Sequence, residues 1–252
     1  AATIEEIMET DVRPIPFTMD QEEVAYLFRQ YGLVSTPVVD DSGRVIGMIT
    51  VDDIVHVIDE EAEDDLMKLA GLGESDLYGR VFATAKSRAT WLTVNLGTAV
   101  LASLVIGLFE ATLSQAVALA VLMPIVASMG GNAGMQTLTV AVRALAMKDL
   151  SATNALRFIG KECLVGLSNG LLFAVLTGAV AWLWFGRADI GVIIGLAMIV
   201  NMLIAGLSGT LIPLALEKLK IDPAVASAVF LTTITDVVGF FAFLGLAALF
   251  IL

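Results

Sequence analysis

The sequence predicts a mainly α-helical membrane protein, with five transmembrane helices preceded by a small soluble α/β module and a connecting helix. Three observations predict this class. Only 16% of the 252 residues are charged and the mean hydropathy is +0.88, whereas about 25% of residues are charged in soluble globular proteins. Five long segments after residue 88 carry almost no charge. The first 88 residues hold 19 acidic and 7 basic residues, which accounts for the whole formal net charge of −12.

This break in charge predicts a domain boundary near residue 88. We expect a soluble module at residues 1–60, an acidic linker and connecting helix at residues 61–89, and a membrane domain at residues 90–252. The chain starts without methionine and partway through a domain, so we interpret it as a fragment of a longer protein. With one histidine, one cysteine and no paired carboxylates in the apolar segments, the sequence does not indicate an enzyme.

The soluble module is predicted from caps and turns. Asp20 and Glu23 are spaced as a helix start, and Gly32 is a suitable helix end. Two short apolar runs at residues 34–39 and 44–49 flank a polar turn, which predicts a pair of strands. Thr50 and Asp53 then predict the start of a second helix.

An acidic run follows, in which six of the seven residues from 59 to 65 are acidic. Such a density of carboxylates suits hard oxygen-binding cations such as Mg2+. A solvated linker is the alternative, since that is the usual role of a charge run. The candidate ligands here are Asp59, Glu61, Glu63 and Asp64. Leucines after the run predict a connecting helix that extends to residue 88.

The five apolar segments are long enough to span a bilayer as helices, which needs roughly 17–25 residues. Helices are expected because an apolar segment in lipid must satisfy its own backbone. If the spans alternate, eight basic residues of the loops fall on one side and only Arg187 on the other, which predicts a cytoplasmic N-terminus and an outside C-terminus. An odd number of spans favours a pathway on the two-fold axis of a homodimer. The predicted spans are residues 91–109, 116–142, 163–186, 190–216 and 223–252.

Asp236 is the strongest candidate functional residue, because it lies in the middle of the fifth span. A charged side chain at this depth costs about 2.5–3.5 kcal/mol and usually faces a bundle interior or a watery cavity. A structural acid paired with a buried base is the alternative, but no Lys or Arg lies at comparable depth in another span. We therefore predict an ion-pathway carboxylate, with Thr232 one turn earlier as a second oxygen ligand.

The second span is interrupted by Pro124 and by the sequence Gly130-Gly131-Asn132-Ala133-Gly134. Proline removes a helical hydrogen bond and paired glycines allow another backbone to approach. We expect the glycines to shape the pathway and Asn132 to contribute a ligand oxygen. The alternative is a helix-packing face formed by the first and last of these glycines. A polar stripe follows helical spacing along the span and consists of Asn132, Gln136, Thr139 and Arg143.

The sequence resembles two known families. The motifs Thr36-Pro37-Val38-Val39-Asp40 and Gly43-Arg44-Val45-Ile46-Gly47 resemble a cystathionine-beta-synthase (CBS) module over about residues 3–59, with one repeat where such modules work in pairs. The resemblance implies a nucleotide such as ATP near Asp53, although we favour a capping role for that residue. With the acidic linker, the spans, the Gly-Gly-Asn segment and Thr235-Asp236, the chain resembles the MgtE family of Mg2+ channels.

The MgtE resemblance implies a multi-pass inner-membrane homodimer in which two Asp236 carboxylates face hydrated Mg2+. It also implies that the connecting helix acts as a plug and that cytoplasmic Mg2+, bound among acids that include Asp222, locks it. The chain departs from the family pattern at Ala228-Val229, where relatives carry a small residue followed by proline. The expected partners are the bilayer, divalent cations and a second copy, with no nucleic acid. A proton- or sodium-coupled exchanger and a non-transporting membrane sensor are the alternative functions.

Overall fold

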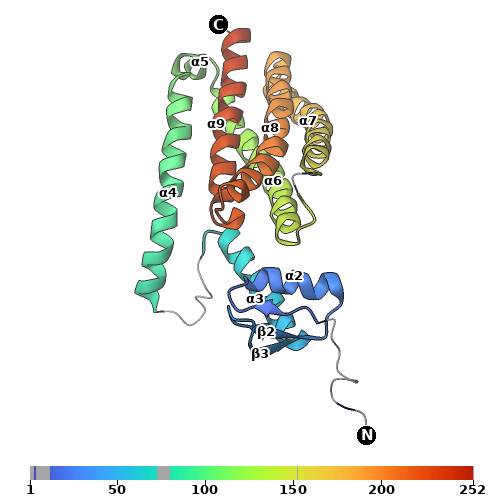
Figure 1. Ribbon diagram of the computed structural model, residues 1–252. Coiled ribbons are helices and arrows are strands. Elements are labelled where there is room, and N and C mark those ends of the chain that lie inside the picture. Colours follow the sequence, from blue (N-terminus) through green and yellow to red (C-terminus); the bar gives the residue numbers. More distant parts are fainter. Residues whose placement is uncertain (1–2, 4–11, 73–79, 152, 252) are drawn as a thin grey trace. The chain divides into compact units, whose positions relative to one another are not determined.

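The computed structural model describes residue 3 and residues 12–72, 80–151 and 153–251. The chain divides into two compact units, Ala1–Asp65 and Leu66–Leu252, and the boundary falls within helix α3 (Val51–Leu69). Helices and strands are labelled in Figure 1. Each unit is described separately.

The first unit is a small α/β module with one three-stranded sheet. Strand β1 (Ile15–Pro16) pairs in parallel with β2 (Ser35–Val39), which pairs in antiparallel with β3 (Val45–Thr50). Helix α2 (Gln21–Tyr31) connects β1 to β2. A small apolar core joins the sheet and the helices and consists of Ile15, Val24, Ala25, Phe28 and Ile54.

The starts of α2 and α3 are capped by side-chain hydrogen bonds, and a glycine ends α2, as the sequence predicts. The Asp20 carboxylate accepts the backbone N–H of Glu22, and Gly32 ends α2 with a φ of 61°. The Asp53 carboxylate accepts both the backbone N–H of Thr50, at 3.0 Å, and its hydroxyl, at 2.8 Å. This is half of a capping box, in which an acid of the first turn reaches back to the capping residue.

Helix α3 differs from the predicted linker. It continues through the whole acidic run to Leu69, where the sequence predicts a linker from residue 61. Glu and Ala are strong helix formers, and the apolar side of the helix supports the same conformation. The connecting helix expected up to residue 88 is also interrupted. Gly71 adopts a φ of 70° and α4 begins only at Val81, while residues 73–79 of the expected helix lie outside the described residues.

Within the described residues of the second unit, five helices are long and apolar enough to cross a membrane, which confirms the predicted number. They are α4 (Val81–Gly107), α6 (Val117–Ala146), α7 (Ala155–Phe185), α8 (Ala188–Lys218) and α9 (Pro223–Ile251). A short helix, α5 (Glu110–Gln115), follows α4.

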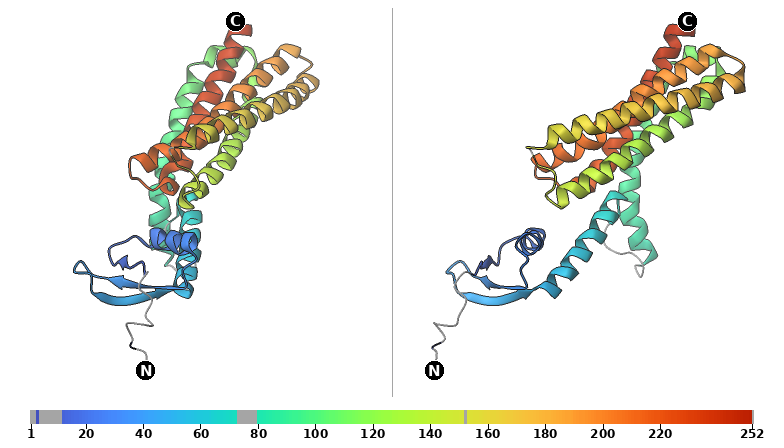
Figure 2. Two further views of the ribbon diagram at one scale, coloured as in Figure 1. Left: turned by 45° about the vertical axis from the view of Figure 1, so that its right-hand side comes forward. Right: turned by 90° about the vertical axis from the view of Figure 1, so that its right-hand side faces the viewer.

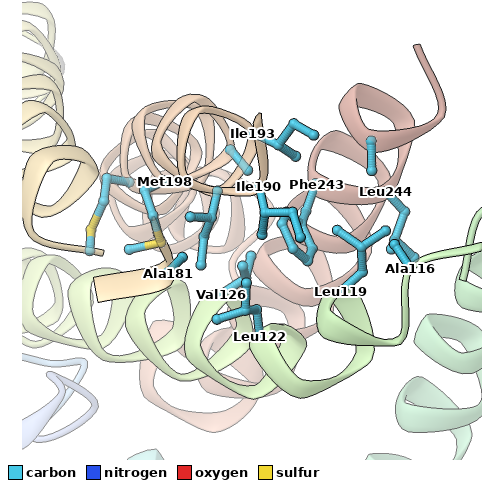
Figure 3. Close-up of a cluster of buried hydrophobic side chains, with 14 residues drawn as sticks. Ala116, Leu119, Leu122, Val126, Ala181, Ile190, Ile193, Met198, Phe243 and Leu244 are labelled. Atoms are coloured by element: carbon cyan, nitrogen blue, oxygen red, sulfur yellow. The ribbon is translucent and has the colours of Figure 1, made fainter. Parts of the chain in front are cut away.

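Helix α8 is the centre of this unit and packs against α7, α6 and α9 (Figures 1 and 2). Within its most apolar stretch 61% of the residues are buried, against 6% for α4, which packs mainly on α9. Side chains from α6, α8 and α9 interdigitate in the main core, with Val126, Met198 and Phe243 among them (Figure 3).

Glycines let α7 and α8 approach closely. A Cβ atom added at Gly191 would lie 2.6 Å from the carbonyl oxygen of Gly178, which is closer than real Cβ contacts. The backbone of Met202 faces Gly166 in the same way, and the backbone of Glu162 faces Gly206. Close backbone approach through small residues is a common basis of helix association in membranes.

We predict that Gly191→Ala destabilises the membrane unit by about 1–3 kcal/mol, because the new methyl group meets backbone atoms that cannot move aside cheaply. Thermal unfolding of the purified protein in detergent, followed by tryptophan fluorescence, measures the effect. Gly97→Ala is the matched control, since a Cβ at Gly97 meets nothing within 4 Å. Equal unfolding temperatures for the two variants would contradict this account of the α7–α8 contact.

Candidate functional site

Asp236 lies near the middle of α9, half-buried and without a partner charge. No hydrogen bond or ion pair joins it to another residue that the structure describes. The basic residues of α6–α9 and their loops lie in the first two turns of helices, in their last turns, or between helices, and so cannot neutralise it. They are Arg143, Lys148, Arg157, Lys161, Arg187, Lys218 and Lys220.

The threonines near Asp236 bond to their own helix. The hydroxyl of Thr232 donates to the carbonyls of Ala228 and Val229, at 3.1 Å each. Thr235 is buried and donates to Leu231. A hydroxyl that donates in this way keeps lone pairs with which to accept. Thr232 therefore has a free acceptor side one turn before the carboxylate.

The glycines of α6 differ in what they face. A Cβ added at Gly130 would meet the Asn201 side chain, and one added at Gly134 would meet the Leu231 side chain. Both glycines therefore pack against other helices of the bundle. At Gly131 it would meet nothing within 4 Å. Pro124 lies inside α6, which nevertheless continues as one helix.

The polar stripe of α6 points away from the other helices of its own chain. Its four members are exposed, and the Asn132 amide donates only to the hydroxyl of Ser128 on the same helix, at 3.3 Å. Exposed polar side chains at membrane depth are unfavourable against lipid. The stripe is therefore a surface that requires water or another protein. Its members are Asn132, Gln136, Thr139 and Arg143.

Glu162 is a buried acid that the sequence analysis missed. It is 7% exposed, the hydroxyl of Thr137 donates to its Oε2 at 3.1 Å, and Lys161 lies 3.3 Å from its Oε1. It was missed because it falls just before the predicted span, whereas α7 begins at Ala155. One feature of the sequence does indicate that Glu162 is buried. It lies four residues before Gly166, and residues at that spacing share a helix face.

Asp222 is held by two contacts within the membrane unit. One carboxylate oxygen accepts the backbone N–H of Ala224, at 2.8 Å, and so caps α9; the other lies 2.6 Å from the ammonium group of Lys68. Leu69 packs next to this ion pair against a cluster that includes Leu231. Asp222 was predicted as a metal ligand. In this structure the ammonium group of Lys68 lies where a bound cation would contact its carboxylate.

The acidic run of α3 is partly engaged within the first unit. Glu61 accepts a hydrogen bond from Gln21 and shares another with Glu22. Loss of hydration among crowded protein atoms, followed by the neighbouring charge of Glu61, raises the pKa of Glu22 to about 7. Asp59 and Glu63 are exposed, and Asp64 is partly buried. Among the described residues, no three acidic, histidine or cysteine side chains converge as a set of metal ligands.

Asp53, the weak nucleotide candidate, is engaged in capping. The hydrogen bonds from the backbone and side chain of Thr50 lower the pKa of its carboxyl group. A carboxylate that caps a helix in this way has fewer lone pairs left for a ribose. The geometry therefore favours the structural role.

Comparison with known proteins finds two families. A model of the divalent cation transporter family MgtE matches residues 123–246, and a model of the CBS domain matches residues 4–60. Three curated relatives, each named magnesium transporter MgtE, match 98% of this chain. They come from Bacillus subtilis (34% identical), Enterococcus faecalis (36%) and Thermus thermophilus (35%). The chain covers 55%, 54% and 55% of them respectively, so it spans about half their length.

The Glu22–Glu61 contact predicts that the first unit loses stability as pH rises. Glu22 keeps its proton up to about pH 7 in the folded chain but releases it near 4.5, its ordinary value, when unfolded. The stabilisation is therefore complete below pH 4.5 and is lost as pH rises through 7. Glu22→Gln should slow amide hydrogen exchange in α2 relative to the parent at pH 8, and should leave it unchanged near pH 4.5.

Hydrogen exchange of the whole chain, read by mass spectrometry at each pH, measures this difference. Glu23→Gln removes one charge from the same helical turn and serves as the control. If both substitutions slow exchange equally, or if the effect of Glu22→Gln does not depend on pH, the contact with Glu61 is not its cause.

Proposed function

Residues 123–246 of this chain belong to the MgtE family of divalent cation transporters and residues 4–60 are a CBS domain, and on this premise we propose that the chain passes hydrated Mg2+ across the membrane. The observation that carries the proposal is the unpaired Asp236 carboxylate in the middle of a transmembrane helix. An ionised carboxylate without a base at that depth usually faces the bundle interior or a water-filled cavity, and often marks an ion pathway.

The chemistry of Mg2+ fits a single carboxylate per chain. Mg2+ gives up its water reluctantly and is usually held by one or two carboxylates through the waters that it keeps. One Asp236 from each of two copies supplies that number. More acids around the ion would be expected for a site that strips the water from its cation.

A homodimer is supported by the polar stripe of α6. Asn132, Gln136 and Thr139 are exposed in the single chain and cannot stably face lipid, and Arg143 continues the stripe into the last turn of α6. A second copy on the other side of a watery pathway gives them a suitable environment. Gly131, which faces open space, and Asn132 then lie along that pathway.

Regulation by cytoplasmic Mg2+ belongs to the same proposal. We assign residues 1–60 to a cytoplasmic module, 61–89 to the connecting segment and 90–252 to the pore, with the C-terminus outside. The acids of α3 in the first unit, and separately Asp222 in the second, are the candidate ligands of a regulatory cation. Lys68 pairs with Asp222 at 2.6 Å, so a cation at Asp222 has to compete with this ammonium group. ATP at Asp53 is a weaker candidate, because the capping bonds already occupy that carboxylate.

We predict that Asp236→Asn reduces Mg2+ flux into liposomes containing the purified protein at least 10-fold. The substitution keeps the shape of the side chain and removes the charge that attracts the cation. Uptake is measured with a fluorescent Mg2+ indicator inside the vesicles. Asp189→Asn is the matched control, because Asp189 is an acid of the same bundle that already forms an ion pair with Arg187; it should conduct as the parent does.

The same assay separates the alternatives. Flux that follows the electrochemical gradient without a proton or sodium gradient argues against an exchanger, and any flux at all argues against a non-transporting sensor. Normal conduction by Asp236→Asn, with the dimer intact, would refute the assignment of the pathway carboxylate.

A further inference from the structure

Asn201 is a completely buried polar residue at the junction of three helices. It lies on α8, and its Nδ2 donates to the backbone carbonyl of Val126 on α6, at 2.8 Å. A Cβ added at Gly130 of α6 would come within 2.3 Å of Nδ2, and one added at Gly239 of α9 within 2.9 Å. One amide group therefore touches both neighbouring helices, in places where only glycine leaves room for it.

The amide is energetically unfavourable where it stands. The amide contacts the backbone of Val126 and two glycines, and Val126 belongs to the apolar core cluster, as do Met198 and Met202 on the same helix as Asn201. Its Oδ1 is buried and receives no hydrogen bond from any residue that the structure describes. Flipping the amide, which exchanges the positions of Oδ1 and Nδ2, does not satisfy both atoms. Nδ2 would then lack a partner, and Oδ1 would face the carbonyl oxygen of Val126. A leucine would remove the unpaired acceptor, so the presence of asparagine calls for a reason other than stability.

The hydrogen bond supplies what apolar packing lacks, which is a defined position along the helix axis. Apolar contacts are non-directional, so that two helices packed only through them can slide or rotate with little cost. A hydrogen bond at 2.8 Å is directional and fixes one register. Single buried asparagines set the register of coiled coils in this way, at the expense of stability.

The junction lies one helical turn from the proposed pathway carboxylate. Gly239 follows Asp236 by three residues on α9, and residues at that spacing share a helix face. On α6, Gly130 precedes Asn132 by two residues. The hydrogen bond of Asn201 therefore fixes α6, and its close packing on Gly239 positions α9, near the candidate pathway residues of both helices.

We propose that Asn201 is a positioning residue for cation passage: its amide sets the register of α6 and α9 against α8, so that Asp236 meets the hydrated ion at the correct depth. This inference rests on the proposed function of Asp236. It explains why a buried core contains an unpaired acceptor and why glycines face it from two sides.

The test compares Asn201→Leu with the parent in stability and in Mg2+ uptake by liposomes. Leucine fills a similar volume and removes the unpaired acceptor, and Val126 keeps its place within the continuous helix α6. We expect the variant to unfold in detergent at the same temperature or higher. The Mg2+ concentration that gives half-maximal flux should rise at least about 5-fold. A purely structural role would change only the amount of active protein, and hence the maximal flux.

Two further variants keep the result unambiguous. Gly239→Ala pushes a methyl group against the amide and should shift half-saturation in the same direction, even if Asn201→Leu folds poorly. Asn169→Leu, an amide of α7 with no hydrogen bond to α6 or α9 among the described residues, should leave half-saturation unchanged. Unchanged half-saturation in both Asn201→Leu and Gly239→Ala would overturn the inference. If Asp236→Asn conducts normally, it is the proposed function that fails.

Discussion

The membrane unit depends on one constraint: inside a bilayer there is no water to satisfy a polar group, so every such group must find a partner in the protein. Helix α8 meets this constraint by packing closely against three neighbours through glycines, with its backbone bonds internal and its surface apolar. Glu162 meets it through Thr137 and Lys161. Among the described residues, Asp236 and the Oδ1 atom of Asn201 do not meet it within the single chain, and the polar stripe of α6 meets it only through bonds to its own helix.

These exceptions have a common explanation in the proposed function. An unpaired carboxylate and an exposed polar stripe are both stable when they border a hydrated pathway, and the second copy of the chain completes its wall. The buried amide of Asn201 also lowers stability, and it fixes the positions of α6 and α9 against α8. Stability given up at particular residues, within an otherwise consistent structure, is typical of functional sites.

Hydropathy and capping signals predicted much of this structure. The five spans follow from their length and composition, and the ends of α2 follow from Asp20 and Gly32. The buried faces could not be predicted, because helices such as α8 are apolar on all sides and show no periodicity that distinguishes core from lipid. Which glycine packs and which faces open space, and the pairing of Lys68 with Asp222, depend on contacts between distant segments. The helical conformation of the acidic run was not predicted, because a charge run is usually a solvated linker, whereas helix propensity and one apolar side extend α3 through it.

The central claim, that Asp236 faces water in a cation pathway, is tested most directly by the accessibility of its position. Cys163 is the single cysteine of the chain, so a Cys163→Ala background allows Asp236→Cys to be labelled alone with a membrane-impermeant methanethiosulfonate reagent. The account predicts rapid labelling of Asp236→Cys and no labelling of Phe241→Cys, which lies on another face of α9, where the parent ring is exposed beside Phe109 and would face lipid. Failure of the reagent to reach Asp236→Cys, or equal labelling of both cysteines, would contradict it.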